Sequence, residues 1–522
     1  MEAVMSVSDA RRWWAVGALA LSALVVGLDT TVLNVALPTL ATDLEASTSE
    51  LQWFANAYNL VFAAVLLPAG LSGDRYGRKK LLVVALVLFG AASVGCAYSG
   101  STDALIWWRA LLGLGAGFIF PLSLSVLPVM FSDEERPKAI GMVVTASALG
   151  LPLGPIVGGW LLDNFWWGSV FLINVPMVAL AIVAVLLLLP DSRSPEPPGL
   201  DLVGVLLSSA GLAGITYGAI KAGEKSWGDG TALTMLIGGV VLMLLFVVWQ
   251  RHLAARPDGK PLVDLSLFRS PAFTWGAVMA TVVSFALFGL LFTVPQYYQA
   301  VLGADALGTG LRLLPIIGGI IVGARVGGKV TAKAGPKRLV SVGFLLMAVG
   351  LFMGAVTDTD TSYGYAATWI AVVGLGTGLA LPLAVDSALG ALSTERSGVG
   401  SAVIQTVRQV GGTIGVALLG TILTSSYHSH LEVGSIPDRA ADAAGESVSA
   451  GVLVAQKLHS PALLSSVQES FVHGMNVMLV VCGAIAVVGT VLAALFMPQQ
   501  AKREQPGTDP VAPADAQPRG AL

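Results

Sequence analysis

The chain consists of long apolar runs that are separated by short polar segments. An α-helix needs about 20 apolar residues to cross the hydrocarbon core of a bilayer. Runs of that length recur along almost the whole sequence, so we expect a bundle of membrane-spanning helices. The runs predict fourteen spans, at roughly residues 14–38, 51–71, 80–99, 104–128, 139–161, 168–189, 202–220, 231–250, 273–297, 307–328, 338–357, 364–388, 398–424 and 471–497.

The composition supports a membrane protein. Of the 522 residues, 55% are hydrophobic and 12% are charged, and the mean hydropathy is +0.78, which excludes a water-soluble globular protein. The net charge of −3 and the lack of a basic block give no sign of a nucleic-acid partner. Cys96 and Cys482 both lie inside apolar runs, where packing explains them, so we expect no disulfide and no metal.

The polar loops predict the orientation in the membrane. The first apolar run follows Arg11 and Arg12 but continues to Pro38 without a cleavage-site pattern, so we interpret it as a span and not as a signal peptide. If the N-terminus is cytoplasmic, alternate connections such as DRYGRKK and RHLAARPDGK fall on the same side and hold nearly all the loop lysines and arginines. We therefore expect both termini in the cytoplasm.

A sequence repeat divides the chain. GLSGDRYGRKKLLVV at residues 70–84 has a weaker echo in GKVTAKAGPKRLVSV at residues 328–342, with the glycine, the basic cluster and the following apolar run in the same order. Internal repeats of this kind build many secondary transporters. The repeat predicts two six-helix halves, at residues 1–190 and 265–500, around an inserted helix pair at residues 200–250.

Two further segments complete the predicted organisation. Residues 425–470 form the only long outer loop, for which we expect a short amphipathic helix or hairpin over the outer mouth. His428 and His430 in this loop lack a third candidate ligand, which argues against a metal site. Residues 501–522 are expected to form a disordered cytoplasmic tail.

Asp29 interrupts the first predicted span, within VVGLDTTVLNVALP. A charged residue at the bilayer centre costs roughly 2.5 kcal/mol or more, which makes it a functional candidate. Arg109 comes early in a span of opposite direction, so the two charges fall at a similar depth. We interpret Asp29 as the group that exchanges a proton for substrate, with Arg109 tuning it. A fixed ion pair between two helices is the alternative.

A second pair of charges lies in the C-terminal half. Asp386 is near the inner end of the span at 364–388, and Arg408 lies part-way into the next span from the same side. The two could pair, with Gln405 and Gln409 nearby. The spacing leaves open whether Asp386 carries protons, binds substrate or forms a structural pair with Arg408.

The predicted substrate-binding set combines charges with aromatic faces, because aromatic rings bind flat or quaternary cations. Its members are Asp29, Trp53, Tyr58, Phe288, Phe292 and Arg408. Packing between helices is the competing explanation for each ring.

Four motifs resemble those of a known transporter family. The first predicted helix contains LDTTVLNVALP, and the loop after the second contains GLSGDRYGRKKLL, in which Ser72 replaces the usual leucine. The fourth helix keeps Arg109 and Gly113 but has Leu112 where a glutamine is common, and the fifth contains GLPLGPIVGG. On these motifs the chain resembles a major facilitator superfamily transporter of the fourteen-helix drug:proton antiporter group, and it is similar to bacterial quaternary-ammonium and multidrug exporters.

The resemblance and the residue types together suggest roles for two groups of residues. The loop is interpreted as a gate latch that contains Gly70, Asp74, Arg75, Gly77 and Arg78. The fifth-helix motif, which the resemblance associates with antiporters, contains Gly150, Gly154, Pro155, Gly158 and Gly159. Glycines permit a tight turn in the loop and close helix approach in the fifth helix. A positively charged anchor and generic small-residue packing are the respective alternatives.

The motifs and the resemblance imply an all-α membrane transporter of the major facilitator fold, not an enzyme, in the cytoplasmic (inner) membrane of a bacterium. We expect proton-coupled antiport that exports lipophilic cationic drugs or biocides, by a monomer that uses the proton gradient and no cofactor. The alternatives are a narrow-specificity exporter of a natural product or lipid, and a proton-coupled importer. An ATP-driven pump is disfavoured, because GARVGGKV at residues 323–330 lacks the Ser/Thr of a P-loop.

Overall fold

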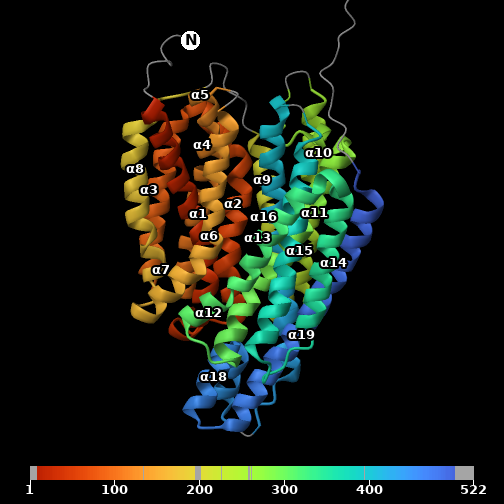
Figure 1. The fold of residues 1–522 in the computed structure, drawn as a ribbon. Helices are drawn as coiled ribbons and strands as arrows, with labels where there is room; N and C mark the ends of the chain where they lie inside the picture. The colour runs from red at the N-terminus through yellow and green to blue at the C-terminus, as the bar shows by residue number, and fades with distance from the viewer. Residues whose placement is uncertain are drawn as a thin grey trace, which may run out of the picture.

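The computed structural model describes residues 9–132, 135–193, 201–224, 226–256, 259, 261–392, 394–434 and 436–499. Helices make up nearly all of this described part, and none of it lies in a β-strand, which confirms the all-α prediction. The helices form one elongated bundle with α5 at one end and α18 at the other, and we name these the α5 end and the α18 end (Figure 1). The predicted disordered tail at 501–522 lies outside the described residues.

The N-terminal half is built from helices that run along the length of the bundle. They are α1 (Asp9–Asp43), α2 (Thr48–Tyr76), α3 (Arg78–Ala97), α4 (Thr102–Ser125), α6 (Arg136–Asn164) and α8 (Asn174–Leu188), with the short α5 (Leu127–Met130) and α7 (Ser169–Leu172) between them. α1 packs along α6, α2 packs along α4, and α3 contacts both α4 and α8.

The C-terminal half follows the short helix η2 (Leu265–Arg269). Its helices are α11 (Pro271–Gln296), which continues into the π-helical turn η3 (Tyr297–Val301), α12 (Ala306–Arg312), α13 (Leu314–Ala334), α14 (Pro336–Gly354), α15 (Tyr363–Leu389), α16 (Thr394–His430) and α19 (Pro461–Phe496). α15 packs on α13, α14 and α11, and α16 packs on α11 and α19.

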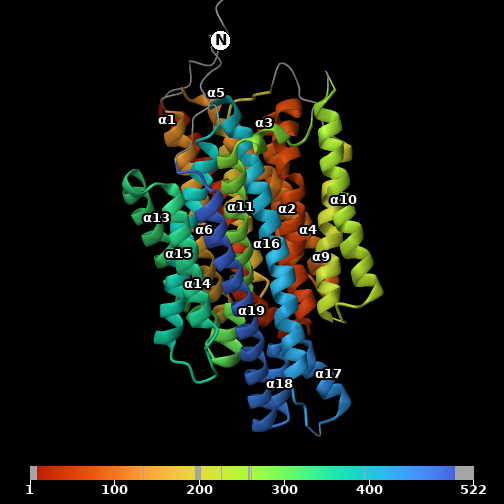
Figure 2. The ribbon, with the colours of Figure 1, turned by 90° about the vertical axis from the view of Figure 1, so that its right-hand side faces the viewer.

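A further pair of helices, α9 (Leu202–Glu224) and α10 (Gly230–Ala254), lies beside the main bundle (Figure 2). α9 contacts α2 from one half and α16 from the other. The Thr421 hydroxyl of α16 donates a hydrogen bond to the Ala219 carbonyl of α9 at 2.8 Å. Gln409 of α16 also donates to the Asn59 side chain of α2. α9 therefore packs on two helices, one from each half, that contact each other.

Twelve helices of the described part are long and apolar enough to cross a membrane. α2 and α6 are not among these twelve, although each has 29 residues. At 1.5 Å per residue a helix of this length reaches about 43 Å, which exceeds the hydrocarbon thickness of about 30 Å. The membrane-protein prediction is confirmed by the twelve spans, and the count of fourteen stays a prediction.

The sequence repeat has a counterpart in the backbone. α2 ends at Tyr76 and α3 begins at Arg78, so Gly77 alone turns the chain, with a φ of +104°. Gly335, which the repeat aligns with Gly77, joins α13 to α14 in the same way with a φ of +78°. Residues with a Cβ rarely adopt these angles, so both turns depend on glycine.

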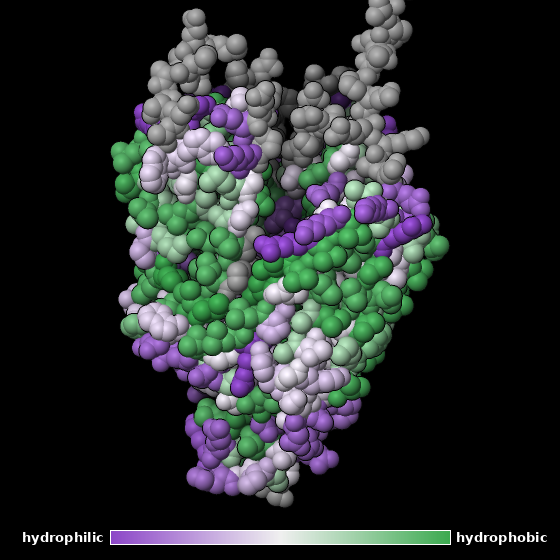
Figure 3. All heavy atoms as spheres, viewed as in Figure 1, coloured by the Kyte–Doolittle hydropathy of each residue, from purple (hydrophilic) through white to green (hydrophobic). Residues whose placement is uncertain are grey.

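The two halves touch at the α18 end and are separated by a hollow toward the α5 end. The Asp163 carboxylate of α6 accepts hydrogen bonds from the backbone N–H groups of Ala306 and Leu307 at the start of α12, at 3.2 and 3.0 Å. Gln299 donates to the Val35 carbonyl of α1 at 3.0 Å. The hollow between the halves is visible in Figure 3. The bundle is therefore closed at the α18 end and open toward the α5 end.

The long loop is shorter than the sequence predicts, because α16 continues to His430 and α19 begins at Pro461. Between them lie the short helices α17 (Asp438–Glu446) and α18 (Val448–Lys457). The Tyr427 hydroxyl donates to the Ala444 carbonyl at 2.7 Å and fastens α17 to α16. No group of three or more His, Cys, Asp or Glu side chains suited to a metal ion occurs within the described residues.

Candidate functional site

A buried ion pair joins α1 to α4 inside the N-terminal half. Nη1 of Arg109 lies 2.8 Å from Oδ2 of Asp29. Asp29 is 0% exposed and Arg109 is 1% exposed. The prediction that the two charges lie at the same depth is therefore confirmed. Charges in such a dry environment persist only when they are paired and hydrogen-bonded.

α2 holds the remainder of the Arg109 guanidinium. Its Nε donates to the Phe54 carbonyl at 2.9 Å. Its central carbon lies 4.5 Å from the centre of the Tyr58 ring, which is cation–π geometry. Tyr58 is 1% exposed. The sequence predicts that Tyr58 stacks on a substrate, but in the structure its ring stacks on Arg109 and encloses the ion pair.

Asn174 belongs to this cluster and was missed by the sequence analysis. Its Nδ2 donates to Oδ1 of Asp29 at 3.0 Å and to Oγ of Ser93 on α3 at 3.3 Å. Asn174 and Ser93 are both 0% exposed. The signal that could have found Asn174 is an amide within the apolar run at 168–189, since polar groups inside spans are costly.

Each carboxylate oxygen of Asp29 therefore has its own partner, and no part of the side chain is exposed. A bound molecule in the space between the halves cannot touch this carboxylate in the observed conformation. The chemistry open to the cluster is proton uptake. A proton on Asp29 removes its negative charge and leaves Arg109 as an uncompensated cation in a site that excludes water.

The glycines of the α6 motif bring α6 into backbone contact with α1, so the expected close packing is present. A Cβ atom at Gly150 would overlap the backbone of Gly27, and one at Gly154 would overlap Thr31. A Cβ at Gly158 would also press against α1. The Thr31 hydroxyl donates to the Gly150 carbonyl at 2.8 Å and adds a hydrogen bond between the helices.

Two motif residues face the C-terminal half. A Cβ at Gly159 would overlap the backbone of Ala306, and the Pro155 carbonyl lies against Gly310 of α12. α6 thus touches α1, which carries Asp29, on one side and α12 on the other. The motif connects the buried ion pair to the closed α18 end.

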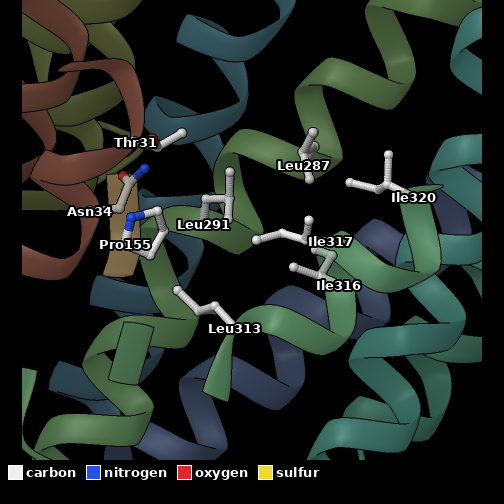
Figure 4. Close-up of a pocket in the computed structure, with 9 residues that line it drawn as sticks. All are labelled: Thr31, Asn34, Pro155, Leu287, Leu291, Leu313, Ile316, Ile317 and Ile320. Carbon is white, nitrogen blue, oxygen red and sulfur yellow. The ribbon is translucent and has the colours of Figure 1, made fainter. Parts of the chain in front are cut away.

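A pocket lies between the two halves and is mainly aliphatic (Figure 4). Its lining consists of Thr31, Asn34, Pro155, Leu287, Leu291, Leu313, Ile316, Ile317 and Ile320. The polar side chains in this lining are those of Thr31 and Asn34, on the helix that carries Asp29. Such a wall suits a lipophilic molecule with few polar groups.

The fold and this site agree with a comparison to known families, in which residues 19–416 match the Major Facilitator Superfamily. The chain belongs to the Major Facilitator Superfamily. Within the superfamily it is 33% identical to the multidrug efflux pump LfrA of Mycolicibacterium smegmatis, over 92% of this chain and 96% of that protein. It is 32% identical to the tetracenomycin C resistance and export protein of Streptomyces glaucescens, over 98% of this chain and 96% of that protein.

Solved structures share the major facilitator fold with this chain. A bacterial homolog of the human lysosomal transporter Spinster, in an inward-facing and unoccupied conformation, aligns with a TM-score of 0.67 and 17% identity, over 96% of this chain and 100% of that chain. A D-xylose-proton symporter aligns with a TM-score of 0.59 and 15% identity, over 94% of this chain and 99% of that chain. At these identities the likeness shows the fold alone.

The predicted binding set contains three further aromatic residues, and none of them lines the pocket of this transporter. They are Trp53, Phe288 and Phe292. The Trp53 ring packs against Tyr217 of α9, with 6.2 Å between ring centres. Phe292 is buried in the core, and Phe288 lies against Gly412 of α16. The pocket wall is aliphatic where the sequence predicts rings, because helix packing turns these rings toward neighbouring helices.

Asp386 and Arg408 do not form an ion pair within the described part of the chain. Nε of Arg408 donates to Oγ of Ser284 on α11 at 3.3 Å, and Nη1 donates to Gln405 at 3.1 Å. Asp386 is exposed on α15, which contacts α16 only slightly. The structural pair of Asp386 and Arg408 that the sequence left open is therefore wrong, because Arg408 lies on the face of α16 that packs against α11. The roles of both residues stay predictions.

The predicted gate loop lies where α2 meets α3. The backbone N–H of Arg78 donates to the Ser192 carbonyl at 3.0 Å, which ties the start of α3 to the segment after α8. Arg75 is exposed, with its guanidinium carbon 5.6 Å from the centre of the Tyr76 ring. The Asp74 side chain lies outside the described part of the structure. Its predicted latch role stays a prediction.

Gly77→Ala is expected to destabilise the turn between α2 and α3, whereas Gly70→Ala is not. Alanine at a φ of +104° is strained, at a cost of about 1–3 kcal/mol. A Cβ at Gly70 meets nothing within 4 Å, so alanine fits at that position. The prediction that the turn needs glycine at residue 70 is therefore wrong. Thermal unfolding of both variants in detergent measures the difference. Equal unfolding temperatures would contradict the glycine-dependent turn.

Proposed function

We propose that this protein is a proton-coupled antiporter that exports lipophilic small molecules, with cationic drugs or biocides as the expected class, from the cytoplasm of a bacterium. In this proposal it lies in the cytoplasmic membrane with both termini inside, acts as a monomer and uses the proton gradient in place of a cofactor. The observation that carries the proposal is the buried ion pair of Asp29 and Arg109. The relatives named as drug and antibiotic export proteins support the direction of transport.

The enclosure of Asp29 supports its role in proton coupling. The ionised carboxylate is tolerated in a dry site because Arg109 and Asn174 bind its two oxygens. Protonation removes the charge that holds Arg109, and an unpaired buried guanidinium is costly. The N-terminal half then either releases the proton or changes conformation around α1 and α4. Proton uptake in this way shifts the balance between two conformations.

α1 supplies a route from the ion pair to the substrate pocket. Thr31 and Asn34 line the pocket on the same helix as Asp29. α6 is fixed to α1 by the motif glycines, and α6 also meets α12 at the closed end. A displacement of α1 on protonation therefore changes both the pocket wall and the contact that closes the α18 end.

The aliphatic pocket supports a lipophilic substrate more directly than a positively charged one. A cation could approach Asp29 only after the contacts to Arg109 and Asn174 open. A narrow-specificity exporter of a natural product is the second candidate. One relative, named for the export of the single compound tetracenomycin C, favours it.

Asp29→Asn is expected to abolish gradient-driven export and to lower the stability, because asparagine keeps the shape of the side chain but loses the titrating proton and leaves the buried Arg109 without a countercharge. Export is therefore compared at equal amounts of folded, reconstituted protein. The measurement is ethidium movement in proteoliposomes with and without an imposed proton gradient. Asp103→Asn is the matched control, since Asp103 is an exposed carboxylate in the first turn of α4. Gradient-driven export by Asp29→Asn at the wild-type rate would overturn proton coupling through this residue.

The same assay separates the two substrate classes. Transport of ethidium by the wild type supports a multidrug exporter that accepts cations. If the wild type moves an uncharged lipophilic compound but no cation, the narrow-specificity candidate replaces the cationic one, and the Asp29→Asn comparison is repeated with that compound.

A further inference from the structure

The amide of Asn174 is only half used in the observed state. Nδ2 donates both of its hydrogens, one to Oδ1 of Asp29 and one to Oγ of Ser93. The carbonyl oxygen Oδ1 of Asn174 is buried and accepts no hydrogen bond. A buried acceptor without a donor costs free energy, so such a group calls for an explanation.

A half-turn of the amide exchanges the positions of Nδ2 and Oδ1 within nearly the same shape. In the observed orientation Asn174 donates, which suits an ionised Asp29. In the turned orientation Oδ1 faces Asp29 and Ser93 as an acceptor. An acceptor in that place suits a protonated Asp29, whose carboxylic O–H donates. The Ser93 hydroxyl serves both states, because a hydroxyl can accept or donate.

We propose that Asn174 and Ser93 are positioning residues that respond to the protonation state of Asp29 by rotation of the Asn174 amide. The inference rests on the proposed proton coupling and deepens it. One proton from the aqueous phase binds Oδ1 of Asp29, the carboxylate becomes a carboxylic acid, and its O–H donates to Oδ1 of Asn174. No other covalent bond forms or breaks, and the net charge of the cluster rises by one.

The surroundings of Asp29 leave this role to Asn174. The charged and titratable groups that face Asp29 are Arg109 from α4, Tyr58 from α2 and Cys96 from α3. α6 presents glycine to this part of α1, and α8 presents Asn174. Arg109 has no acceptor atom, so it cannot follow a change from carboxylate to carboxylic acid. An amide offers both a donor and an acceptor.

Rotation of the amide also carries the signal to other helices. Asn174 is the first residue of α8, and its side chain binds Asp29 of α1 and Ser93 of α3. This one side chain therefore links α8 to both α1 and α3. When the amide turns, the hydrogen bond to Ser93 reverses its direction. The protonation state of α1 is thus communicated to α3 and α8, whereas Arg109 communicates it to α4 and α2.

Infrared difference spectroscopy of the purified protein between acid and neutral pH tests the proposal without a transport assay. We expect a carboxylic acid band that is absent in Asp29→Asn, and a side-chain amide band that titrates with it. Asn174→Leu removes the amide band. Asn476→Leu is the matched control, because Asn476 also donates Nδ2 to one carbonyl and has a buried Oδ1 without a partner, but lies on α19. The control keeps the titrating band.

The transport assay adds a second measurement. In Asn174→Leu we expect the midpoint of the pH dependence of export to move by about one pH unit toward alkaline pH, because the ionised Asp29 loses a charge-assisted hydrogen bond. Asn476→Leu keeps the wild-type midpoint. If Asn174→Leu fails to fold, selective ¹⁵N labelling of asparagine side chains is applied to the wild type and to Asn174→Gln, which keeps an amide but carries no label at position 174. A titrating band whose isotope shift is lost in Asn174→Gln is assigned to Asn174.

The outcomes separate the two proposals. An Asp29 band that titrates while the Asn174 amide band stays constant overturns the inference and leaves proton coupling in place. The absence of any Asp29-dependent acid band across the pH range in which the gradient drives export overturns both. The inference is supported if the two bands titrate together and the amide band is either lost in Asn174→Leu or assigned to Asn174 by labelling.

Discussion

Arg109→Met is expected to cause a severe loss of stability together with the loss of export. The substitution removes the guanidinium that binds Asp29, whose side chain is 0% exposed in the structure, and leaves Asn174 as its hydrogen-bond donor. Removal of one member of a buried ion pair costs about 3–5 kcal/mol. The hydrogen bond to the Phe54 carbonyl is lost as well. The yield of folded protein and the unfolding temperature in detergent measure the effect.

Two further variants show what the ion pair is for. Arg325→Met is the matched control, because Arg325 lies in α13, is exposed and forms no ion pair among the described residues. We expect it to unfold like the wild type. The double variant Asp29→Asn with Arg109→Met removes both charges and is expected to regain stability without gradient-driven export. Gradient-driven export by the double variant would mean that the pair only fastens α1 to α4.

Depth within the membrane could be predicted from the sequence. A helix rises 1.5 Å per residue, and consecutive spans alternate in direction. Asp29 lies well along the first span and Arg109 lies early in the fourth, so the two charges had to fall at a similar level. The ion pair of 2.8 Å confirms this reasoning. The same physical logic identified the α6 glycines, because small residues in a span predict close approach of another helix.

The direction in which each side chain points could not be predicted, because it depends on which helices become neighbours. Trp53 turns toward α9, whose position beside α2 and α16 is set by long-range packing. Arg408 turns toward α11 and not toward Asp386 on α15. An apolar span has little hydrophobic asymmetry, so its pattern does not mark the buried face. The predicted substrate-binding set, which rests on residue type alone, therefore contains core and helix-interface positions that do not line the pocket.

The depth of Asn174 could be predicted from the sequence, but the direction of its side chain could not. It lies near the start of α8, as Arg109 lies near the start of α4, so a depth argument places the two together. An uncharged polar group inside a span also needs a partner, so the amide of Asn174 is a signal of the same kind as a charge. The structure adds that its donor faces Asp29, and that fact required the packing of α8 against α1.

Gly150→Ala is expected to disrupt the packing of α1 on α6. The added Cβ would overlap the backbone of Gly27 and Leu28, and a backbone cannot rotate away as a side chain can. Overpacking of this kind costs about 1–3 kcal/mol or more. The strain falls beside Asp29, so we expect a lower unfolding temperature and a lower rate of gradient-driven export.

Gly141→Ala provides the matched control on the same helix, because a Cβ at Gly141 meets nothing within 4 Å. Alanine in a helix is favoured over glycine by about 1 kcal/mol, so this variant is expected to equal or exceed the wild type in stability. If Gly150→Ala is as stable and as active as Gly141→Ala, the contact between α1 and α6 is not tight. The motif would then not connect Asp29 to the closed end. A loss confined to Gly150→Ala shows that export depends on the closeness of these two helices.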